Sequence, residues 1–427
     1  MRPGVQPATV TRRPVGVRPL DVFDGDGLRT VFQPVVDLAT DTVVGYEALV
    51  RGPEGGPALD PTALLASARD AGRLVDLDWA CRSLALRTAL HAGLRPPTLL
   101  FVNAEPESLA SPCPRALLRE VADAHRRLDV VVEVTERHLL HQPDRLLRAV
   151  EVMRGLGWQV ALDDVGATDA GLALLPVLRP DVVKLDRWLL ARTRGRERER
   201  ILTVVRAYAE DTGAAVVAEG IETPQDRESA VEIGARWGQG YLLGRPGSID
   251  LEAAASSHPP LRLGRPSADR SDWDGAAFDL LAEHSTSAGP DATSPDERVR
   301  ELCERAESAP RSGVLLLSVP APTRLSSETW MQLARLHSLC ALVSVLSAAP
   351  PPRRLPWVRV SRLGPADPLA QECCAVLLSP AHAVAVVARP AEAGTWHTVR
   401  SEDPRVVSRL ARLLVARTGA VTYDDWD

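Results

Sequence analysis

The chain has 427 residues, too many for one ordinary hydrophobic core, so two domains are expected. Its 45% hydrophobic and 25% charged residues are typical of a globular protein, and its net charge of −6 argues against a nucleic-acid polymer or an anionic membrane as a partner. No apolar run approaches the roughly 20 residues that a membrane span requires.

The N-terminal region and the cysteines give two further expectations. Residues 1–28 are basic and Pro-rich without the apolar core of a secretory signal, so we expect a flexible tail. The six cysteines form no CxxC pair and have no histidines at zinc spacing, which favours reduced thiols in a cytoplasmic protein. Adjacent Cys373 and Cys374 could be redox-active, but their apolar context favours a buried strand.

Residues 29–250 alternate apolar, β-branched runs with amphipathic stretches. The expected strands are 30–38, 42–50, 98–104, 130–136, 159–165, 181–186, 214–220 and 237–244. The expected helices between them include 61–92, 106–127, 144–156, 197–211 and 224–236. Eight strands with intervening helices predict an α/β fold, a (β/α)8 barrel of the TIM type. The first two strands must form a hairpin because so few residues separate them, so one strand runs antiparallel to the rest.

A smaller α/β domain is expected to follow the barrel. Residues 251–295 are rich in Ala, Ser, Pro, Gly and Asp and are predicted to be a linker, within which 272–284 could form a short helix. In the second domain, 296–420, we expect helices at 295–307, 326–338 and 403–417 and strands at 313–319, 340–347, 374–379 and 383–390. Trp330 is expected to pack against this sheet.

Polar residues end most of the barrel strands, where barrels of this type carry their functional groups. These residues are Glu47, Asn103, Glu133, Asp163 with Asp164, Lys184, Glu219 and Gln239. Neighbouring carboxylates repel unless cations lie among them, and carboxylate and amide oxygens suit Mg²⁺ or Mn²⁺ better than zinc. Each residue alone has a simpler explanation, as a helix N-cap, a solvated loop residue or, for Asn103, the end of a strand. Their joint occurrence predicts a metal site.

Lys184 is the single lysine among the 50 Lys and Arg residues of the chain. Taken alone, Lys184 could be a surface residue that persists by drift and has no function. Because it ends a predicted strand beside the metal-binding strand ends, we expect its compact ammonium to have a role there.

Seven segments resemble, in order and spacing, the EAL-domain cyclic-di-GMP phosphodiesterases. They are "YEALVR", "FVNAEP", "VEVTE", "ALDDVG", "VVKLD", "VAEGIET" and "GQGYLLGRP", and the resemblance covers about residues 30–247. It implies a barrel with one antiparallel strand that hydrolyses cyclic di-GMP to linear pGpG with two Mg²⁺ or Mn²⁺ ions. No motif of the cyclase that makes cyclic di-GMP is present.

The resemblance also implies a role for each matching residue. One metal would be held by Glu47, Asn103, Glu133 and Asp163. The second would be held by Asp163, Asp164 and Glu219. Glu219 would deprotonate the attacking water, and Lys184 would hydrogen-bond that water. The supporting residues implied are Arg51, Gln33 and Gln239 for the substrate and Glu136 and Glu222 as further carboxylates, although Glu136 and Glu222 could also be helix-start residues.

One loop departs from the family pattern. After the aspartate pair the family usually has Phe-Gly, then Thr or Ala, then Gly-Tyr-Ser-Ser, whereas this chain has "DDVGATDAG" over 163–171. Val165 replaces the Phe, and Thr168, Asp169, Ala170 and Gly171 replace the last four residues. Every ligand is kept, but the family loop steadies the metal site, so turnover and regulation are in question.

Two functional hypotheses follow. The complete ligand set and Lys184 favour an enzyme regulated by its second domain, which resembles a DICT sensory domain. The altered loop favours a weak or inactive barrel that binds cyclic di-GMP as a receptor, and the ligand ring argues against a scaffold that binds neither. The expected partners are cyclic di-GMP, a second copy of the chain through the barrel and a ligand or signalling partner of the second domain, with no nucleic-acid polymer and no membrane.

Overall fold

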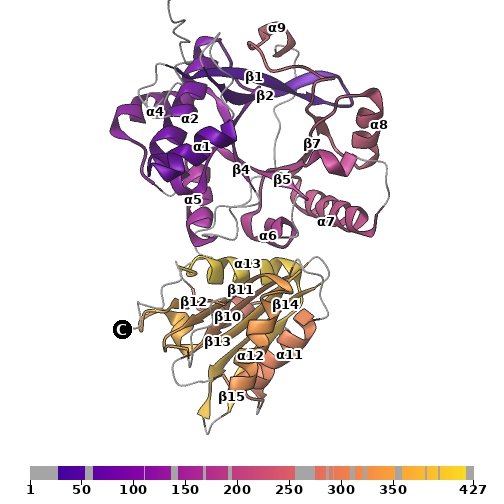
Figure 1. Ribbon diagram of the computed structural model, residues 1–427. Coiled ribbons are helices and arrows are strands. Elements are labelled where there is room, and N and C mark those ends of the chain that lie inside the picture. The colour runs from indigo at the N-terminus through magenta and orange to yellow at the C-terminus, as the bar shows by residue number, and fades with distance from the viewer. Residues whose placement is uncertain are drawn as a thin grey trace, which may run out of the picture.

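A closed eight-stranded barrel and a seven-stranded sheet make up the protein (Figure 1). The computed structural model describes residues 27–52, 61–109, 111–135, 143–166, 170–190, 195–254, 275–284, 288–291, 293–307, 313–320, 325–351, 358–379, 382–392 and 395–419. Most of the expected N-terminal tail therefore lies outside the described residues. Within them, no helix combines the length and the apolar character needed to cross a bilayer.

The barrel strands follow one another around the ring in chain order. They are β1 (Arg29–Asp37), β2 (Thr42–Arg51), β3 (Leu99–Asn103), β4 (Asp129–Thr135), β5 (Gln159–Val165), β6 (Val182–Leu185), β7 (Ala215–Ala218) and β8 (Trp237–Gly238). β1 pairs antiparallel with both β2 and β8, and the other pairs are parallel. The prediction of a TIM-type barrel with one antiparallel strand is confirmed.

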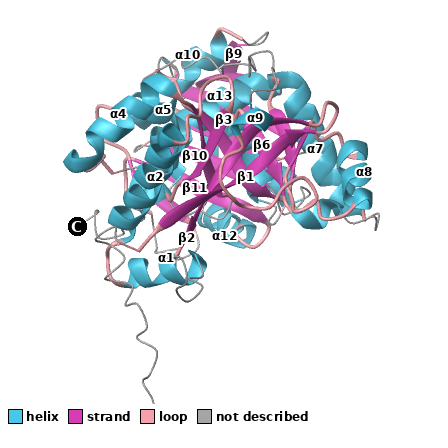
Figure 2. Ribbon diagram, turned by 90° about the horizontal axis from the view of Figure 1, so that it is seen from above, coloured by secondary structure: helices cyan, strands magenta, loops and turns pink. Residues whose placement is uncertain are grey.

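Helices surround this ring, as the view from above shows (Figure 2). They are α1 (Pro61–Asp70), α2 (Leu74–His91), α3 (Pro106–Leu109), α4 (Leu118–Arg127), α5 (Pro143–Gly155), α6 (Ala170–Leu178), α7 (Arg196–Thr212), α8 (Pro224–Glu232) and α9 (Leu251–Ala254). Short 3-10 turns lie at η2 (Arg115–Leu117) and η4 (Arg187–Leu190).

Three predictions for the barrel are wrong in detail. The helix expected over 61–92 is two helices, because Gly72 adopts a left-handed φ of 66° that ends α1. The helix expected over 106–127 is broken by Pro112 and Pro114, since proline cannot continue a helix. The last strand has two residues rather than eight, because the chain turns and the Leu243 amide donates to the Gly240 carbonyl.

The lower part of the barrel interior is filled by apolar side chains. Alternate strand residues point inward, and ten of them form one buried cluster: Val35, Val44, Leu99, Phe101, Val131, Ala161, Val182, Ala215, Val217 and Trp237. This packed layer closes the barrel below the strand ends, so the polar residues that follow on these strands can gather only at the C-terminal mouth.

The second domain is one mixed sheet with strand order β12-β11-β10-β13-β14-β15-β9. Its strands are β9 (Ala288–Asp291), β10 (Gly313–Val319), β11 (Cys340–Ser347), β12 (Arg359–Arg362), β13 (Cys373–Leu378), β14 (Ala383–Pro390) and β15 (Trp396–Ser401). Its helices are α10 (Ala277–Ala282), α11 (Pro295–Glu307), α12 (Ser327–Leu336) and α13 (Pro404–Val415), with a 3-10 turn η6 (Pro368–Gln371).

Helices cover both faces of this sheet, which explains its continuous apolar strands. Leu315 and Leu317 of β10 belong to the cluster with α11 and α12, whereas Val314 and Leu316 belong to the cluster with α13. Trp330 is buried in the first of these clusters, as expected. Cys373 and Cys374 are buried free thiols on β13, which confirms their assignment to a strand.

Part of the predicted linker belongs to the second domain. α10 is the short helix expected within 272–284, and β9 pairs with β15 at the edge of the sheet. β9 reads "AGPD", and its Gly and Pro disfavour a strand except at an edge, so no local pattern predicts this strand. The four-residue β12 and the polar β15 were also not predicted.

Gly45 offers a test of the barrel packing. A Cβ there would lie 2.8 Å from the Leu99 carbonyl oxygen and 2.8 Å from Phe101 Cε2. We expect Gly45→Ala to lower the free energy of unfolding by about 1–3 kcal/mol, because the backbone of β3 cannot move aside. Gly155→Ala is the control, since a Cβ there meets nothing within 4 Å. Urea unfolding followed by circular dichroism measures both, and equal stability of the two variants would contradict the expectation.

Candidate metal centre

Four carboxylates surround one ammonium at the mouth of the barrel. Lys184 Nζ lies 2.6 Å from Glu219 Oε1 and 2.8 Å from Glu133 Oε1. It also lies 3.4 Å from Glu47 Oε2 and 3.5 Å from Asp163 Oδ1. The five residues come from five different strands or strand ends, and the closed ring of the barrel brings them together.

Lys184 is buried, with 1% of its side chain exposed. Burial alone would lower its pKa, but the charges of Asp163, Glu133, Glu219 and Glu47 outweigh that effect and hold the pKa of Lys184 well above its usual range. The lysine is therefore a fixed positive charge at the centre of the site.

Amide side chains hold Glu47 in place. Its Oε2 accepts a hydrogen bond from Gln239 Nε2 at 2.6 Å, and its Oε1 accepts one from Asn103 Nδ2 at 3.0 Å. Gln239 Nε2 also lies 3.3 Å from Gln33 Oε1, so both glutamines line this side of the site. Burial raises the pKa of Glu47, but Lys184 and these amide donors together lower it by more than burial raises it. The pKa of Glu47 therefore lies below its usual value.

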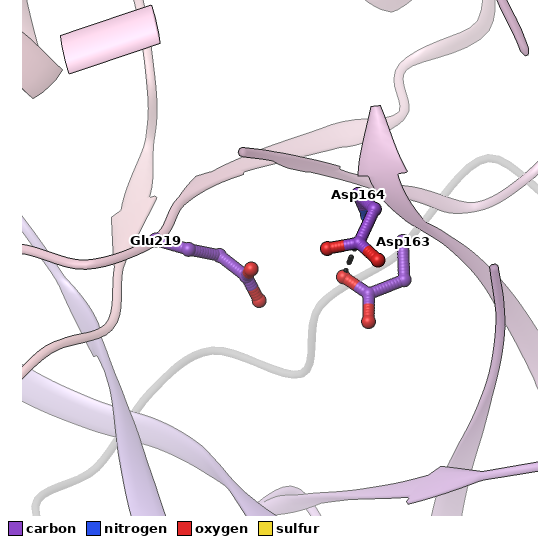
Figure 3. A group of neighbouring side chains, drawn as sticks. All are labelled: Asp163, Asp164 and Glu219. Atoms are coloured by element: carbon purple, nitrogen blue, oxygen red, sulfur yellow. Dashed lines mark hydrogen bonds between the residues drawn. The ribbon is translucent and has the colours of Figure 1, made fainter. Parts of the chain in front are cut away.

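Asp163, Asp164 and Glu219 form a second group beside the first. One carboxylate oxygen from each lies within 4.8 Å of the others, a spacing that lets them share a cation. Figure 3 shows Glu219 pointing toward the two aspartates. Successive strand residues normally point to opposite faces, but Asp164 has a left-handed φ of 58°, which breaks this alternation at the end of β5.

The burial of the Glu133 carboxylate supports a cation-binding site here. Both of its carboxylate oxygens are buried, and neither accepts a hydrogen bond of good geometry within the described part of the chain, although Lys184 is in ion-pair range. A buried carboxylate whose charge is only partly compensated is costly, and a bound cation would reduce that cost. The donor set of carboxylates and one amide fits Mg²⁺ or Mn²⁺.

Two carboxyls of the site have raised pKa values. Burial, reinforced by the charge of Glu47, raises the pKa of Glu133 well above its usual range. Burial also raises the pKa of Glu219 to about 8, although Lys184 opposes the shift. Protonated carboxyls reduce the repulsion in the site, and a bound cation would displace those protons.

Two predicted site residues, Arg51 and Glu222, are not brought into this cluster. Arg51 Nη1 donates to the Val50 carbonyl at 2.8 Å, and no contact to the cluster is seen within the described residues. Glu222 instead forms a two-pronged ion pair with Arg187, at 2.8 and 2.9 Å. Glu136 lies outside the described residues, as do residues 167–169 of the divergent loop.

A buried charge network behind Asn103 was not predicted. Arg82, which is 1% exposed, donates from Nη2 to Asp78 and to Ser108 Oγ, the latter at 2.6 Å. Asp78 Oδ1 accepts a hydrogen bond from the Glu105 amide at 3.2 Å. This network ties α2 to the segment that follows Asn103. Asp78 and Arg82 are four residues apart on one helix face, a spacing that indicates an ion pair between them.

A second unpredicted contact fixes the start of the divergent loop. Trp188 Nε1 donates to the Gly166 carbonyl at 3.1 Å, which ties the residues after Asp164 to the turn after Lys184. Gly166 has a left-handed φ of 103°, and a Cβ there would lie 2.9 Å from Leu189 Cδ1. The sequence does not reveal this contact because the two segments belong to different strands.

Comparison with known families gives one match. A family model described as the EAL domain matches residues 20–246, more than half of the chain. The matched residues contain all eight barrel strands and the carboxylate cluster. They do not extend into the second domain, so its resemblance to a DICT domain stays a prediction.

Curated relatives match over the same part of the chain. "Probable cyclic di-GMP phosphodiesterase PdeG" of Escherichia coli is 29% identical over 240 residues, 54% of this chain and 47% of the relative. "Cyclic di-GMP phosphodiesterase NbdA" of Pseudomonas aeruginosa is 33% identical over 235 residues, 52% of this chain and 29% of the relative. The chain thus spans less than half the length of either. A solved Klebsiella pneumoniae BlrP1 calcium/cy-diGMP complex is 29% identical, covering 56% of this chain and 58% of that one, with a TM-score of 0.46.

Replacing Lys184 tests the charge balance of the cluster. We expect Lys184→Met to lower the free energy of unfolding by about 3 kcal/mol or more in EDTA, because it leaves buried carboxylates without their counter-charge. Added Mn²⁺ should then raise the melting temperature more in the variant than in the wild type, since the ammonium no longer repels the cation. Thermal unfolding with EDTA and with MnCl₂ measures both effects.

Arg236→Met is the control for that experiment. Arg236 also pairs with a carboxylate of the barrel, Asp37, but its side chain is 57% exposed. We expect its loss to change stability by less than about 1 kcal/mol, with no change in the response to Mn²⁺. Equal responses of the two variants to Mn²⁺ would refute the role assigned to Lys184.

Proposed function

Because the chain belongs to the EAL domain family, we propose that it is a metal-dependent phosphodiesterase that hydrolyses cyclic di-GMP to linear pGpG. The observation that carries the proposal is the cluster of Glu47, Glu133, Asp163 and Glu219 around Lys184, with Asp164 beside it. Named cyclic di-GMP phosphodiesterases among the relatives of the barrel support the choice of substrate.

Mg²⁺ or Mn²⁺ would be held by two groups of residues that share Asp163. The first is Glu47, Asn103, Glu133 and Asp163. The second is Asp163, Asp164 and Glu219. Two bound divalent cations supply an acidified water and offset the charge of the attacking and leaving oxygens at phosphorus. An anionic phosphodiester could not otherwise approach so many carboxylates.

The chain's own residues have separate tasks in this proposal. Glu219 takes the proton of the attacking water, which it can do as the carboxylate that remains once bound cations displace its own proton. Lys184 lies 2.6 Å from Glu219 and orients both that carboxylate and the water. Gln33, Gln239 and Arg51 are proposed to contact the dinucleotide.

The second domain is proposed to regulate this activity, and two barrels are proposed to associate as a homodimer. Glu136 and Glu222 are proposed to support the loops around the metals. Glu222 would do so through Arg187, which joins the segment after Glu219 to the turn after Lys184.

The direct test is hydrolysis by the purified chain. We expect pGpG to appear when cyclic di-GMP is incubated with MnCl₂ or MgCl₂, and to be absent with EDTA. Glu47→Ala should lower the rate at least about 100-fold, because losing a ligand costs no less than losing an outer-shell partner. Glu232→Ala, which removes an exposed carboxylate from α8, is the matched control and should keep the wild-type rate. Tight binding of cyclic di-GMP without formation of pGpG would contradict the enzyme hypothesis and support the receptor hypothesis.

Lys184→Arg tests the shape of the central cation at constant charge. The planar, bulkier guanidinium cannot take the place of an ammonium that lies within 3.5 Å of four carboxylates. We expect kcat to fall at least about tenfold, in line with the 10–100-fold effects of residues that orient metal ligands. Steady-state kinetics measures this, and wild-type kcat in the variant would eliminate the role given to Lys184.

A further inference from the structure

α6 is enclosed between the two domains. It reads "AGLALLPVL", and five of its apolar side chains are at most 3% exposed: Leu172, Leu174, Leu175, Val177 and Leu178. A helix that is apolar on all sides has to be buried on all sides. The barrel covers one side of α6, and α13, β10 and β11 of the second domain contact it from the other (Figure 1).

A buried arginine of the second domain holds the end of α6. Arg412, on α13, is 5% exposed. Its Nη1 donates to the Val177 carbonyl in the last turn of α6 at 3.1 Å, and its Nη2 donates to Glu151 Oε1 of α5 at 2.7 Å. The final carbonyls of a helix lack partners within the helix, so this guanidinium satisfies one of them and attaches the end of α6 to α13.

Further hydrogen bonds reinforce this contact from the barrel side. Glu151 Oε1 also accepts from Arg154 Nη1 at 3.2 Å, and Arg154 Nη2 donates to the Leu178 carbonyl at 2.9 Å. Arg148 Nη2 donates in the opposite direction, to the Ala416 carbonyl after α13, at 3.1 Å. Apolar packing alone would join the domains in several registers, whereas these directional bonds select one.

The other end of α6 lies next to the metal ligands. Ala170 begins α6, and only residues 165–169 separate it from Asp164. Gly166, at the start of this short connection, is tied down by Trp188. α6 is about 13 Å long and only five residues join it to Asp164, so the position of α6 limits the positions open to Asp163 and Asp164.

We propose that Arg412 is a positioning residue for the metal centre: through α6, the second domain sets the geometry of Asp163 and Asp164. This inference rests on the proposed function, and it identifies the contact through which the second domain would control the barrel. A signal that loosens α13 from α6 would weaken metal binding without touching any ligand.

The test compares Mn²⁺ binding by the intact chain and its variants, measured by titration calorimetry. Arg412→Met keeps the apolar bulk and removes the hydrogen bonds to Val177 and Glu151. We expect Mn²⁺ affinity to fall about three- to tenfold, the range of coupling effects transmitted through a packed element. In kinetics, kcat at fixed Mn²⁺ should fall while KM for cyclic di-GMP stays within twofold.

Arg405→Ala is the matched control. Arg405 lies on the same helix and also bridges the domains, to Asp211 of α7, but its side chain is 76% exposed. We expect wild-type Mn²⁺ affinity in this variant. A merely structural role for Arg412 would lower the melting temperature and leave Mn²⁺ affinity unchanged, and that result would overturn the proposal.

A second variant covers the case in which Arg412→Met does not fold. Glu151→Gln keeps the side-chain shape and weakens the same contact, so it should lower Mn²⁺ affinity about two- to threefold. Unchanged affinity there would also overturn the proposal. Failure of the wild type to hydrolyse cyclic di-GMP would defeat the proposed function alone, because the Mn²⁺ comparison does not depend on turnover.

Discussion

Charge balance in a closed space is the constraint on which the site depends. Four carboxylates from different strands meet one ammonium, and their oxygens lie between 2.6 and 3.5 Å from Lys184 Nζ. Water cannot relieve this excess of negative charge below the mouth, because a layer of ten apolar side chains fills the barrel there. The chain compensates with one fixed cation, with amide donors to Glu47, and with raised pKa values at Glu133 and Glu219.

The fold and this balance support each other. A barrel brings distant segments to one rim, so Glu47 and Lys184 become neighbours although 137 positions separate them. The same geometry makes the centre sensitive to the placement of each strand end. β5 is followed, after a short connection, by α6, which the second domain contacts through α13, β10 and β11, so Asp163 and Asp164 are open to influence from outside the barrel.

The sequence predicted most strands and the residues of the cluster, because a polar residue after a buried run marks a strand end. It could not predict which side chains touch. Asn103 and Gln239 were recognised as rim residues, yet their shared role as donors to Glu47 depends on the closure of the ring. Arg412 and Arg82 were missed because, in a chain so rich in arginine, a buried one has no distinct local pattern. The uniform apolarity of α6 is a sequence signal for the domain interface.

The use of arginine for nearly every other cation has a consequence for the chemistry of the chain. The single lysine side chain is sealed inside the folded barrel, with 1% of it exposed. Reagents that acylate amines, and proteases that cut only after lysine, therefore meet no lysine target while the barrel is closed. Cleavage at this position would split the chain beside its own carboxylate cluster, and its rate would report how often the barrel opens.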